Sequence, residues 1–453
     1  MVAGTVVLGG SMTNVDTTVV NVALDSLSRD FHASVTSVQW VATGYLLALA
    51  IVIPLSGWAS DRFGGRRVWM VSIALFLAGS MLAGAAWSLG SLIAFRVVQG
   101  IGGGMIMPVG MALVTRAAGP GRVGRVMGLL GVQQLLGPVL GPVIGGVLVE
   151  HAGWRWIFFV NVPIGVLAIV AATRFLPRTP PQPADRLDRR GFLLLSPGIA
   201  ALVYGLAALS GSALAEPRTF LPIVLGLGLV TGFVLHARRA ANPLIDVRLF
   251  LQRAFSAGAF TTFGIGMGLF GALFLLPLYY QQARGGSPLD AGLLLVPQGI
   301  GAGIMVPVAG WLTDRVGAGW VVMAGLAAVV AGTVPFALAG ASTPEPLLAI
   351  ALLVRGAGLG ASTMPAVAGA YATLDEDALA RASSALNVMK RVGGSVGVAL
   401  VAVVLERGLR GASGEDAAVA DAFAATFWWV LGFCALALIP AAFLPRRPAV
   451  ALE

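Results

Sequence analysis

The amino-acid sequence predicts an all-helical protein that crosses a membrane many times. Of its 453 residues, 57% are apolar and only 11% are charged, and the mean hydropathy is +0.89. Soluble domains usually carry about 25% charged residues. The apolar stretches are about 20 residues long, which is the length that a helix needs to span the hydrocarbon core. They do not alternate with period two, so helices rather than a closed barrel satisfy the backbone in lipid.

Fourteen membrane helices are predicted along the chain. The first apolar stretch has no basic segment before it, so we interpret it as a retained span rather than a cleaved signal. The predicted spans are 2–24, 38–58, 68–88, 92–115, 124–149, 155–175, 192–211, 219–236, 254–280, 290–312, 320–340, 346–371, 386–406 and 423–444.

Basic residues predict the orientation of these helices. The chain has 29 of them, and 21 fall in the loops after even-numbered spans and in the tail, against six in the opposite loops. Cytoplasmic loops carry such an excess of Lys and Arg. Both termini are therefore expected in the cytoplasm, in a bacterial inner or plasma membrane. The net charge of +9 is explained by topology, and no nucleic-acid partner is expected.

Nothing in the sequence indicates an enzyme, a metal site or a cofactor. Cys434 is the single cysteine and lies within an apolar stretch, and His32, His151 and His236 are far apart. A disulfide framework or a cysteine metal cluster is thus not expected. Glycine clusters lie inside apolar helices without a following strand or lysine, which argues against nucleotide binding. An ion gradient is therefore the expected energy source.

An internal repeat predicts two similar halves. Residues 57–64 recur as residues 310–317 with five of eight positions identical, and each copy is expected in a loop directly after a span. Gly100, Gly102 and Gly104 then recur as Gly356, Gly358 and Gly360. Transporters with parallel repeats bind substrate between the repeats. The predicted organisation is a six-helix half at 1–176, an inserted helix pair at 177–253, and a second half with a short tail at 254–453.

Three charged residues are predicted inside spans, where each costs about 2.5–3.5 kcal/mol and marks a functional candidate. Asp16 is the acid nearest the middle of a span, and it is our candidate for exchanging a proton and attracting a cation. Arg96 is expected either to sense Asp16 or to anchor helices. The role of Arg355 stays open at this point, and a purely structural ion pair is the alternative for Asp16.

Two glycine-containing motifs are candidates for conformational change. In the first loop copy, arginines explain the topology, but an acid and two glycines are not needed for it and suggest a latch that locks one conformation. The residues are Gly57, Asp61, Arg62, Gly64, Arg66 and Arg67, with Asp314 and Arg315 in the second copy. In the fifth span Gly137, Gly141 and Gly145 give a smooth helix face. Pro138 and Pro142 remove backbone donors and favour a bend, although tight static packing would also explain the glycines.

Residues that could line a substrate cavity are the least specific candidates, because each could equally serve helix packing. They combine flexible, aromatic and amide side chains suited to apolar ligands. They are Met12, Thr13, Gln133, Met107, Phe263, Tyr279, Gln298 and Asn387.

Together these motifs resemble the fourteen-helix drug:proton antiporter family of the major facilitator superfamily, nearly end to end. The matching segments are residues 14–24, 57–67, 96–104, 137–146 and 154–163. The resemblance implies that Asp16 takes part in proton coupling, that Arg96 is linked to proton transfer, and that 57–67 takes part in gating. The resemblance also implies that the motif at 137–146 is associated with antiport rather than uptake. Asp25 and Pro142 depart from the family pattern.

The sequence therefore predicts a proton-coupled antiporter that exports lipophilic, cationic drugs or related small molecules by alternating access, acting as a monomer. The alternative is a dedicated exporter or flippase of one substrate, such as a lipid, a siderophore or a self-made antibiotic. A receptor that transports nothing is a third reading, which the repeat and Asp16 disfavour.

Overall fold

The computed structural model of the protein describes residues 2–118, 140–177, 187–208, 216–240, 243–340, 343–372, 374, 376–411 and 416–446. Within these residues every regular element is a helix. They form two compact units, one comprising Met1–Arg189 with Ser287–Leu293 and the other comprising Arg190–Gly286 with Leu294–Glu453. The predicted three-part division stays a prediction.

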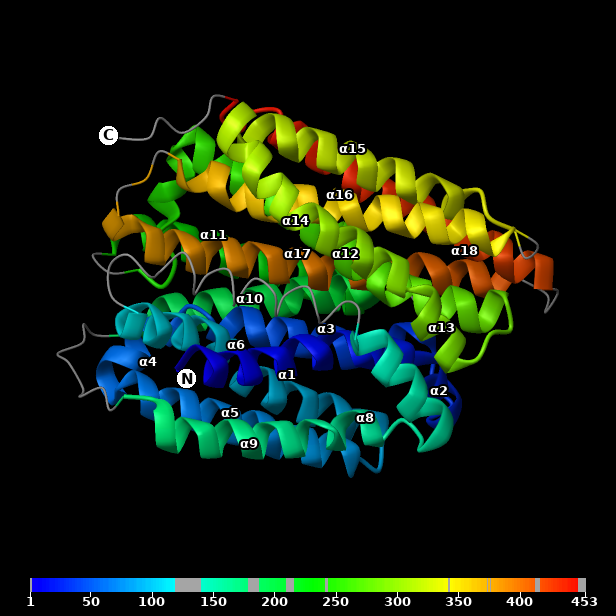
Figure 1. Ribbon diagram of the computed structural model, residues 1–453, viewed down its shortest axis with the longest axis horizontal. Helices are drawn as coiled ribbons and strands as arrows, with labels where there is room; N and C mark the ends of the chain where they lie inside the picture. Colours follow the sequence, from blue (N-terminus) through cyan, green and yellow to red (C-terminus); the bar gives the residue numbers. More distant parts are fainter. Residues whose placement is uncertain are drawn as a thin grey trace. The chain divides into compact units, whose positions relative to one another are not determined.

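The first unit contains helices from the N-terminal part of the chain (Figure 1). They are α1 (Val2–Val22), α2 (Leu24–Asp30), α3 (Val35–Val52), α4 (Leu55–Phe63), α5 (Gly65–Gly84), α6 (Leu89–Ala118), an apolar helix at Leu140–His151, α8 (Trp156–Phe159) and α9 (Asn161–Phe175). Within this unit α6 packs against α1, α3 and α5, and α9 packs against α1 and α5.

The second unit contains most of the remaining helices. They are α10 (Arg189–Ala208), α11 (Pro217–Arg239), η1 (Val247–Leu251), α12 (Arg253–Leu278), η2 (Tyr279–Ala283), α14 (Val296–Val316), α15 (Ala318–Ala337), α16 (Glu345–Tyr371), α17 (Glu376–Gly411) and α18 (Asp416–Ala441). The short helix α13 (Pro288–Leu294) precedes α14 and belongs almost entirely to the first unit. α12 packs against α16, α17 and α18, and α16 packs against α14 and α15.

Eleven helices among the described residues are long and apolar enough to cross a membrane, so the chain is a multi-pass membrane protein. Three predicted spans are not among the eleven. The helix at 2–24 forms as α1 but carries polar residues such as Asn14 and Asp16. The span at 124–149 is described only from Leu140, and the span at 192–211 only to Ala208. The number fourteen stays a prediction.

The repeated motif is helical rather than a loop, which corrects the sequence interpretation. Residues 57–63 lie in α4, and residues 310–316 form the end of α14. Both copies end at their last glycine, because Gly64 has φ 84° and Gly317 has φ 91°. Residues with a Cβ rarely adopt this conformation, so glycine ends both helices. The motif thus marks a sharp corner between α4 and α5 and between α14 and α15.

Close helix approach in the first unit depends on small residues. A Cβ atom on Gly79 of α5 would lie 2.5 Å from the backbone nitrogen of Gln99 in α6, and one on Gly102 of α6 would lie 2.5 Å from that of Phe76. The two backbones therefore pack in direct contact, as small residues permit in membranes. This contact fixes the face of α6 that carries Arg96 and Gln99.

Candidate proton site

Asp16 is buried in the first unit and is the shared acceptor of three side chains. It is 1% exposed, so its charge is removed from water. Its Oδ2 accepts a hydrogen bond from Arg96 Nη1 at 2.6 Å. Its Oδ1 accepts from Gln99 Nε2 at 2.8 Å and from Asn161 Nδ2 at 2.9 Å. The carboxylate on α1 therefore holds α6 and α9 together.

Arg96 is equally buried and makes further contacts beyond the ion pair. It is 1% exposed. Its Nη1 also donates to Gln99 Oε1 at 2.7 Å, and its Nε donates to the carbonyl oxygen of Val41 in α3 at 3.2 Å. The guanidinium carbon lies 4.0 Å from the ring centroid of Tyr45. The aromatic face and the carbonyl supply favourable partners for a cation outside water, so Arg96 is held on α3 as well as on α1.

A second layer of hydrogen bonds orients the amide of Asn161. Its Nδ2 also donates to Ser80 Oγ at 3.1 Å, and the Ser80 hydroxyl donates to the carbonyl oxygen of Phe158 at 2.8 Å. Ser80 is on α5 and Phe158 is on α8. These hydrogen bonds therefore connect α1, α3, α5, α6, α8 and α9 around one carboxylate. We call Asp16, Arg96, Gln99, Asn161 and Ser80 the acid cluster.

The chemistry of the acid cluster follows from its one titratable carboxyl group. A carboxylate accepts hydrogen bonds on both oxygens, whereas a protonated carboxyl becomes a donor at one of them. Binding a proton would therefore remove one acceptor and leave the Arg96 charge unbalanced in a buried site, which costs several kcal/mol. The hydrogen bonds that hold α6 and α9 to α1 would then be weakened. Among the described residues, His, Cys, Asp and Glu side chains form no group that could hold a metal ion.

Arg355 lies in a different cluster in the second unit. It is 1% exposed on α16. Its Nη1 donates to Gln298 Oε1 of α14 at 2.5 Å, and its Nη2 donates to the carbonyl oxygen of Gly268 in α12 at 3.0 Å. Among the described residues it has no carboxylate partner, and its Nε has no hydrogen-bond acceptor. We call Arg355, Gln298 and Gly268 the amide cluster.

The predicted gating residues of the first copy lie around the corner at Gly64. Gly57, Asp61 and Arg62 lie on α4, and Arg66 and Arg67 lie in the first turn of α5. Arg66 Nη2 donates to the carbonyl oxygen of Thr173, near the end of α9, at 2.7 Å. In the second copy, Asp314 and Arg315 lie in the last turn of α14, where the Arg315 guanidinium carbon is 4.1 Å from the Trp311 ring centroid.

The glycine motif of the fifth predicted span is described only in part. Gly137, Pro138 and Gln133 lie outside the described residues. Gly141 and Gly145 lie against α1, where a Cβ would contact the Thr18 side chain and the Val19 backbone. Pro142 packs with its carbonyl oxygen against Gly292 of α13. The two described glycines therefore allow this helix to approach the helix that carries Asp16.

Three of the predicted cavity residues are engaged in helix packing. Met12 and Thr13 are buried on α1, and Thr13 donates to the carbonyl oxygen of Gly10. Tyr279 is fully buried among aromatic rings, including Phe336 at 6.1 Å between centroids. The remaining four differ in their surroundings: Met107 is partly buried on α6, Phe263 lines a groove, Gln298 binds Arg355 and Asn387 is exposed on α17.

Sequence reasoning did not bring Gln99, Asn161, Ser80 and Tyr45 together around the ion pair. Gln99 and Asn161 stood in motifs that could have indicated them, because an amide within an apolar helix needs a partner. Ser80 carries no such signal, since a serine in an apolar helix can donate to its own backbone. Tyr45 carries none either. Only the packing of α3 and α5 on α6 reveals their positions.

Comparison with known proteins identifies the class of the fold. The sequence matches the profile of the Major Facilitator Superfamily over residues 6–245 and 258–452. It is 44% identical to "Multidrug resistance protein B homolog" of Mycobacterium tuberculosis over 89% of this chain and 75% of that one. It is 29% identical to "Uncharacterized MFS-type transporter YhcA" of Bacillus subtilis over 85% and 73% of the two chains. The solved structure of a D-xylose-proton symporter matches with a TM-score of 0.69 at 16% identity, over 98% and 97% of the chains.

Proposed function

The chain belongs to the major facilitator superfamily of membrane transporters, and we propose that it exports lipophilic, cationic small molecules in exchange for protons by alternating access. The name of the mycobacterial relative supports a drug as the substrate.

The single observation that carries this proposal is the position of Asp16. One carboxylate accepts hydrogen bonds from α6 and from α9 while it lies on α1. A proton bound there weakens the contacts of three helices at once, because it removes charge and acceptor capacity together. Proton binding and helix rearrangement are thereby coupled, which is what antiport by alternating access requires.

One helix links the proposed proton site to the proposed gate. α9 begins at Asn161, which donates to Asp16, and its last turn contains Thr173, whose carbonyl oxygen accepts from Arg66. A shift of α9 after protonation of Asp16 would therefore change the Arg66 contact beside the Gly64 corner. We propose that this helix transmits the state of Asp16 to the first motif copy.

The proposal includes a location and an oligomeric state. The excess of basic residues after even-numbered spans supports cytoplasmic termini in a bacterial inner or plasma membrane. The two similar halves need no second copy to complete them, so the monomer is the proposed functional unit. Its partners are protons, the small-molecule substrate and the lipid bilayer.

The test is transport by purified protein in liposomes with an acidic lumen. We expect wild-type protein to concentrate a fluorescent lipophilic cation in the lumen, and a protonophore to abolish this uptake. Asp16→Asn should lose the proton-driven component. Asp25→Asn is the matched control, because Asp25 is also buried but pairs with Arg29 at 2.7 Å, outside the acid cluster.

Each outcome has a defined meaning. Loss of uptake in Asp16→Asn with retention in Asp25→Asn supports the proposal. Equal uptake by Asp16→Asn and wild type would contradict a role for Asp16 in coupling. If no member of a broad panel of lipophilic cations is moved, multidrug export is wrong and the dedicated exporter of one substrate becomes the better account.

A further inference from the structure

An apolar groove of about 530 Å³ lies between α12 and α18 in the second unit. Its walls include Phe260, Leu436 and Ile439, which are 52%, 62% and 62% exposed, so large apolar side chains face outward rather than into the helix bundle. Such a volume is enough for a small ligand or an alkyl chain. The groove extends along α12 from Arg253 to Met267, which is about 21 Å at 1.5 Å per residue.

One end of the groove carries a positive charge. Arg253 is the first residue of α12, and its guanidinium carbon lies 5.0 Å from the ring centroid of Phe443, which also lines the groove. None of the ion pairs among the described residues includes Arg253. The side chain of Gln252 does not cap the helix, so the N-terminal dipole adds to the positive potential.

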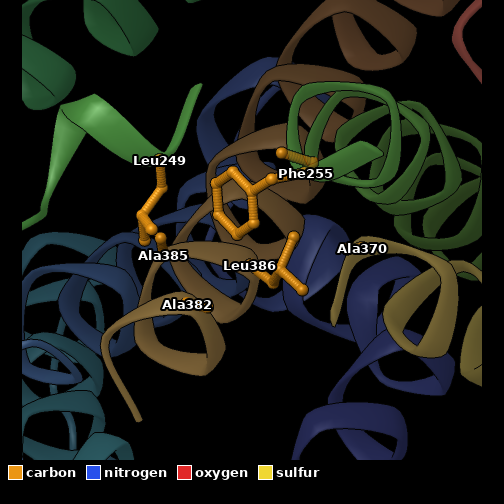
Figure 2. Close-up of a cluster of buried hydrophobic side chains, with 7 residues drawn as sticks. Leu249, Phe255, Ala370, Ala382, Ala385 and Leu386 are labelled. Carbon is orange, nitrogen blue, oxygen red and sulfur yellow. The ribbon is translucent and has the colours of Figure 1, made fainter. Parts of the chain in front are cut away.

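The charged end of the groove is held on a packed base. Phe255, two residues after Arg253, is fully buried in a cluster with Leu249 of η1 and Leu386 of α17 (Figure 2). Ser256 donates to the carbonyl oxygen of Phe250 at 2.6 Å, which fixes η1 against the first turn of α12. These contacts hold the backbone at Arg253 next to the apolar walls of the groove.

We propose that this groove binds an anionic phospholipid, with one acyl chain along α12 and α18 and the phosphate at Arg253. The groove length of about 21 Å matches one leaflet of a bilayer that is about 40–45 Å thick including its headgroup regions. The charge decides between occupants, because Arg253 attracts a phosphate and repels a lipophilic cation. The groove belongs to the second unit and Asp16 to the first, and the inference does not depend on the transported substrate.

The test is lipid-dependent stability of the full chain in neutral detergent. Thermal unfolding is followed while dioleoyl phosphatidylglycerol or dioleoyl phosphatidylcholine is added. We expect half-maximal stabilisation at about fivefold less of the anionic lipid, which corresponds to one arginine–phosphate contact near a membrane surface. Arg253→Gln should remove this preference and Arg253→Lys should keep most of it.

The matched control is Arg239→Gln. Arg239 is an exposed arginine at the end of α11, only a short connection before α12, and it does not line the groove. This variant should keep the preference. The proposal is overturned if Arg253→Gln retains the preference, if Arg253→Lys folds but loses it, or if both glutamine variants lose it equally. It is also overturned if tetraphenylphosphonium displaces the anionic lipid and binds Arg253→Gln more tightly than wild type.

Discussion

Among the described residues, each unit buries one arginine at a helix junction, and the two arginines have different partners. Arg96 faces the carboxylate of Asp16, whereas Arg355 faces a neutral amide and a backbone carbonyl. The acid cluster contains a carboxylate that can bind a proton, whereas the two hydrogen-bond partners of Arg355 carry no ionisable group. The comparison teaches that the two units share a buried arginine, while only the acid cluster contains a carboxylate, the group that we propose as the proton site.

The repeat explains how this asymmetry arises. Gly100 and Gly356 are equivalent in the repeat, so Arg355 occupies the position of Gln99, and Leu352 occupies that of Arg96. The acid cluster uses both positions, with the arginine one turn before the amide. In the amide cluster the arginine stands where the amide would be, and Leu352 is fully buried. The two arginines are therefore not equivalent residues.

The largest expected effect that separates the clusters is on energy coupling. Asp16→Asn should reduce proton-driven uptake to the level of empty liposomes, because asparagine keeps the shape but cannot exchange a proton. Arg355→Gln should retain uptake driven by the proton gradient when equal amounts of folded protein are compared. Uptake by the two variants is measured at several lumen pH values; a loss of pH dependence in Arg355→Gln would break the comparison.

The next effect is on stability. Asp16→Asn leaves Arg96 buried without a counter-ion, and we expect a loss of about 3–5 kcal/mol in the free energy of unfolding. The double variant Asp16→Asn with Arg96→Gln should recover most of that loss, because both charges are gone. Reversible unfolding in mixed detergent micelles measures both. A double variant less stable than the single one would show that the ion pair itself stabilises the unit.

A smaller effect is expected in the amide cluster. Arg355→Gln removes a buried charge whose partners are neutral, so no second substitution is needed to balance it. The free energy of unfolding should fall by about 1–3 kcal/mol, the cost of leaving buried partners unsatisfied. The same unfolding assay applies. A loss as large as that of Asp16→Asn would indicate that Arg355 has an anionic partner after all.

Part of this architecture was accessible from the sequence. The apolar stretches gave most helix positions, and the rarity of charge in spans singled out Asp16, Arg96 and Arg355. The motif at 57–64 was expected in a loop, because it places charged residues directly after an apolar span. The structure instead continues the helix to Phe63, and the chain turns only at Gly64. Hydropathy reports the environment of a segment and does not report its backbone conformation.

Partners across helices could not be read in the same way. Gln298 was selected as a cavity residue, yet its amide oxygen accepts from Arg355. Ser80 gave no signal, since only the packing of α5 places it beside Asn161. Such contacts join residues 57 and 81 positions apart, and local patterns carry no information about which helix faces reach each other.

The smallest predicted effect tests the outer layer of the acid cluster. Ser80→Ala removes one donor to Phe158 and one acceptor of Asn161, and should cost about 1 kcal/mol in unfolding free energy. Transport should keep its proton dependence, because the Asp16 carboxylate keeps Arg96 and Gln99. Unfolding and liposome uptake measure the two readouts. Complete loss of coupling in Ser80→Ala would place the proton site further from Asp16 than we propose.

The central claim is that proton exchange at Asp16 is coupled to substrate export, and proton release on substrate binding tests it most directly. A lipophilic cation is mixed with purified protein in weakly buffered detergent solution containing a pH indicator. The account predicts that wild type and Asp25→Asn release protons on binding, whereas Asp16→Asn binds the cation and releases none. Equal release by Asp16→Asn and wild type would contradict the account.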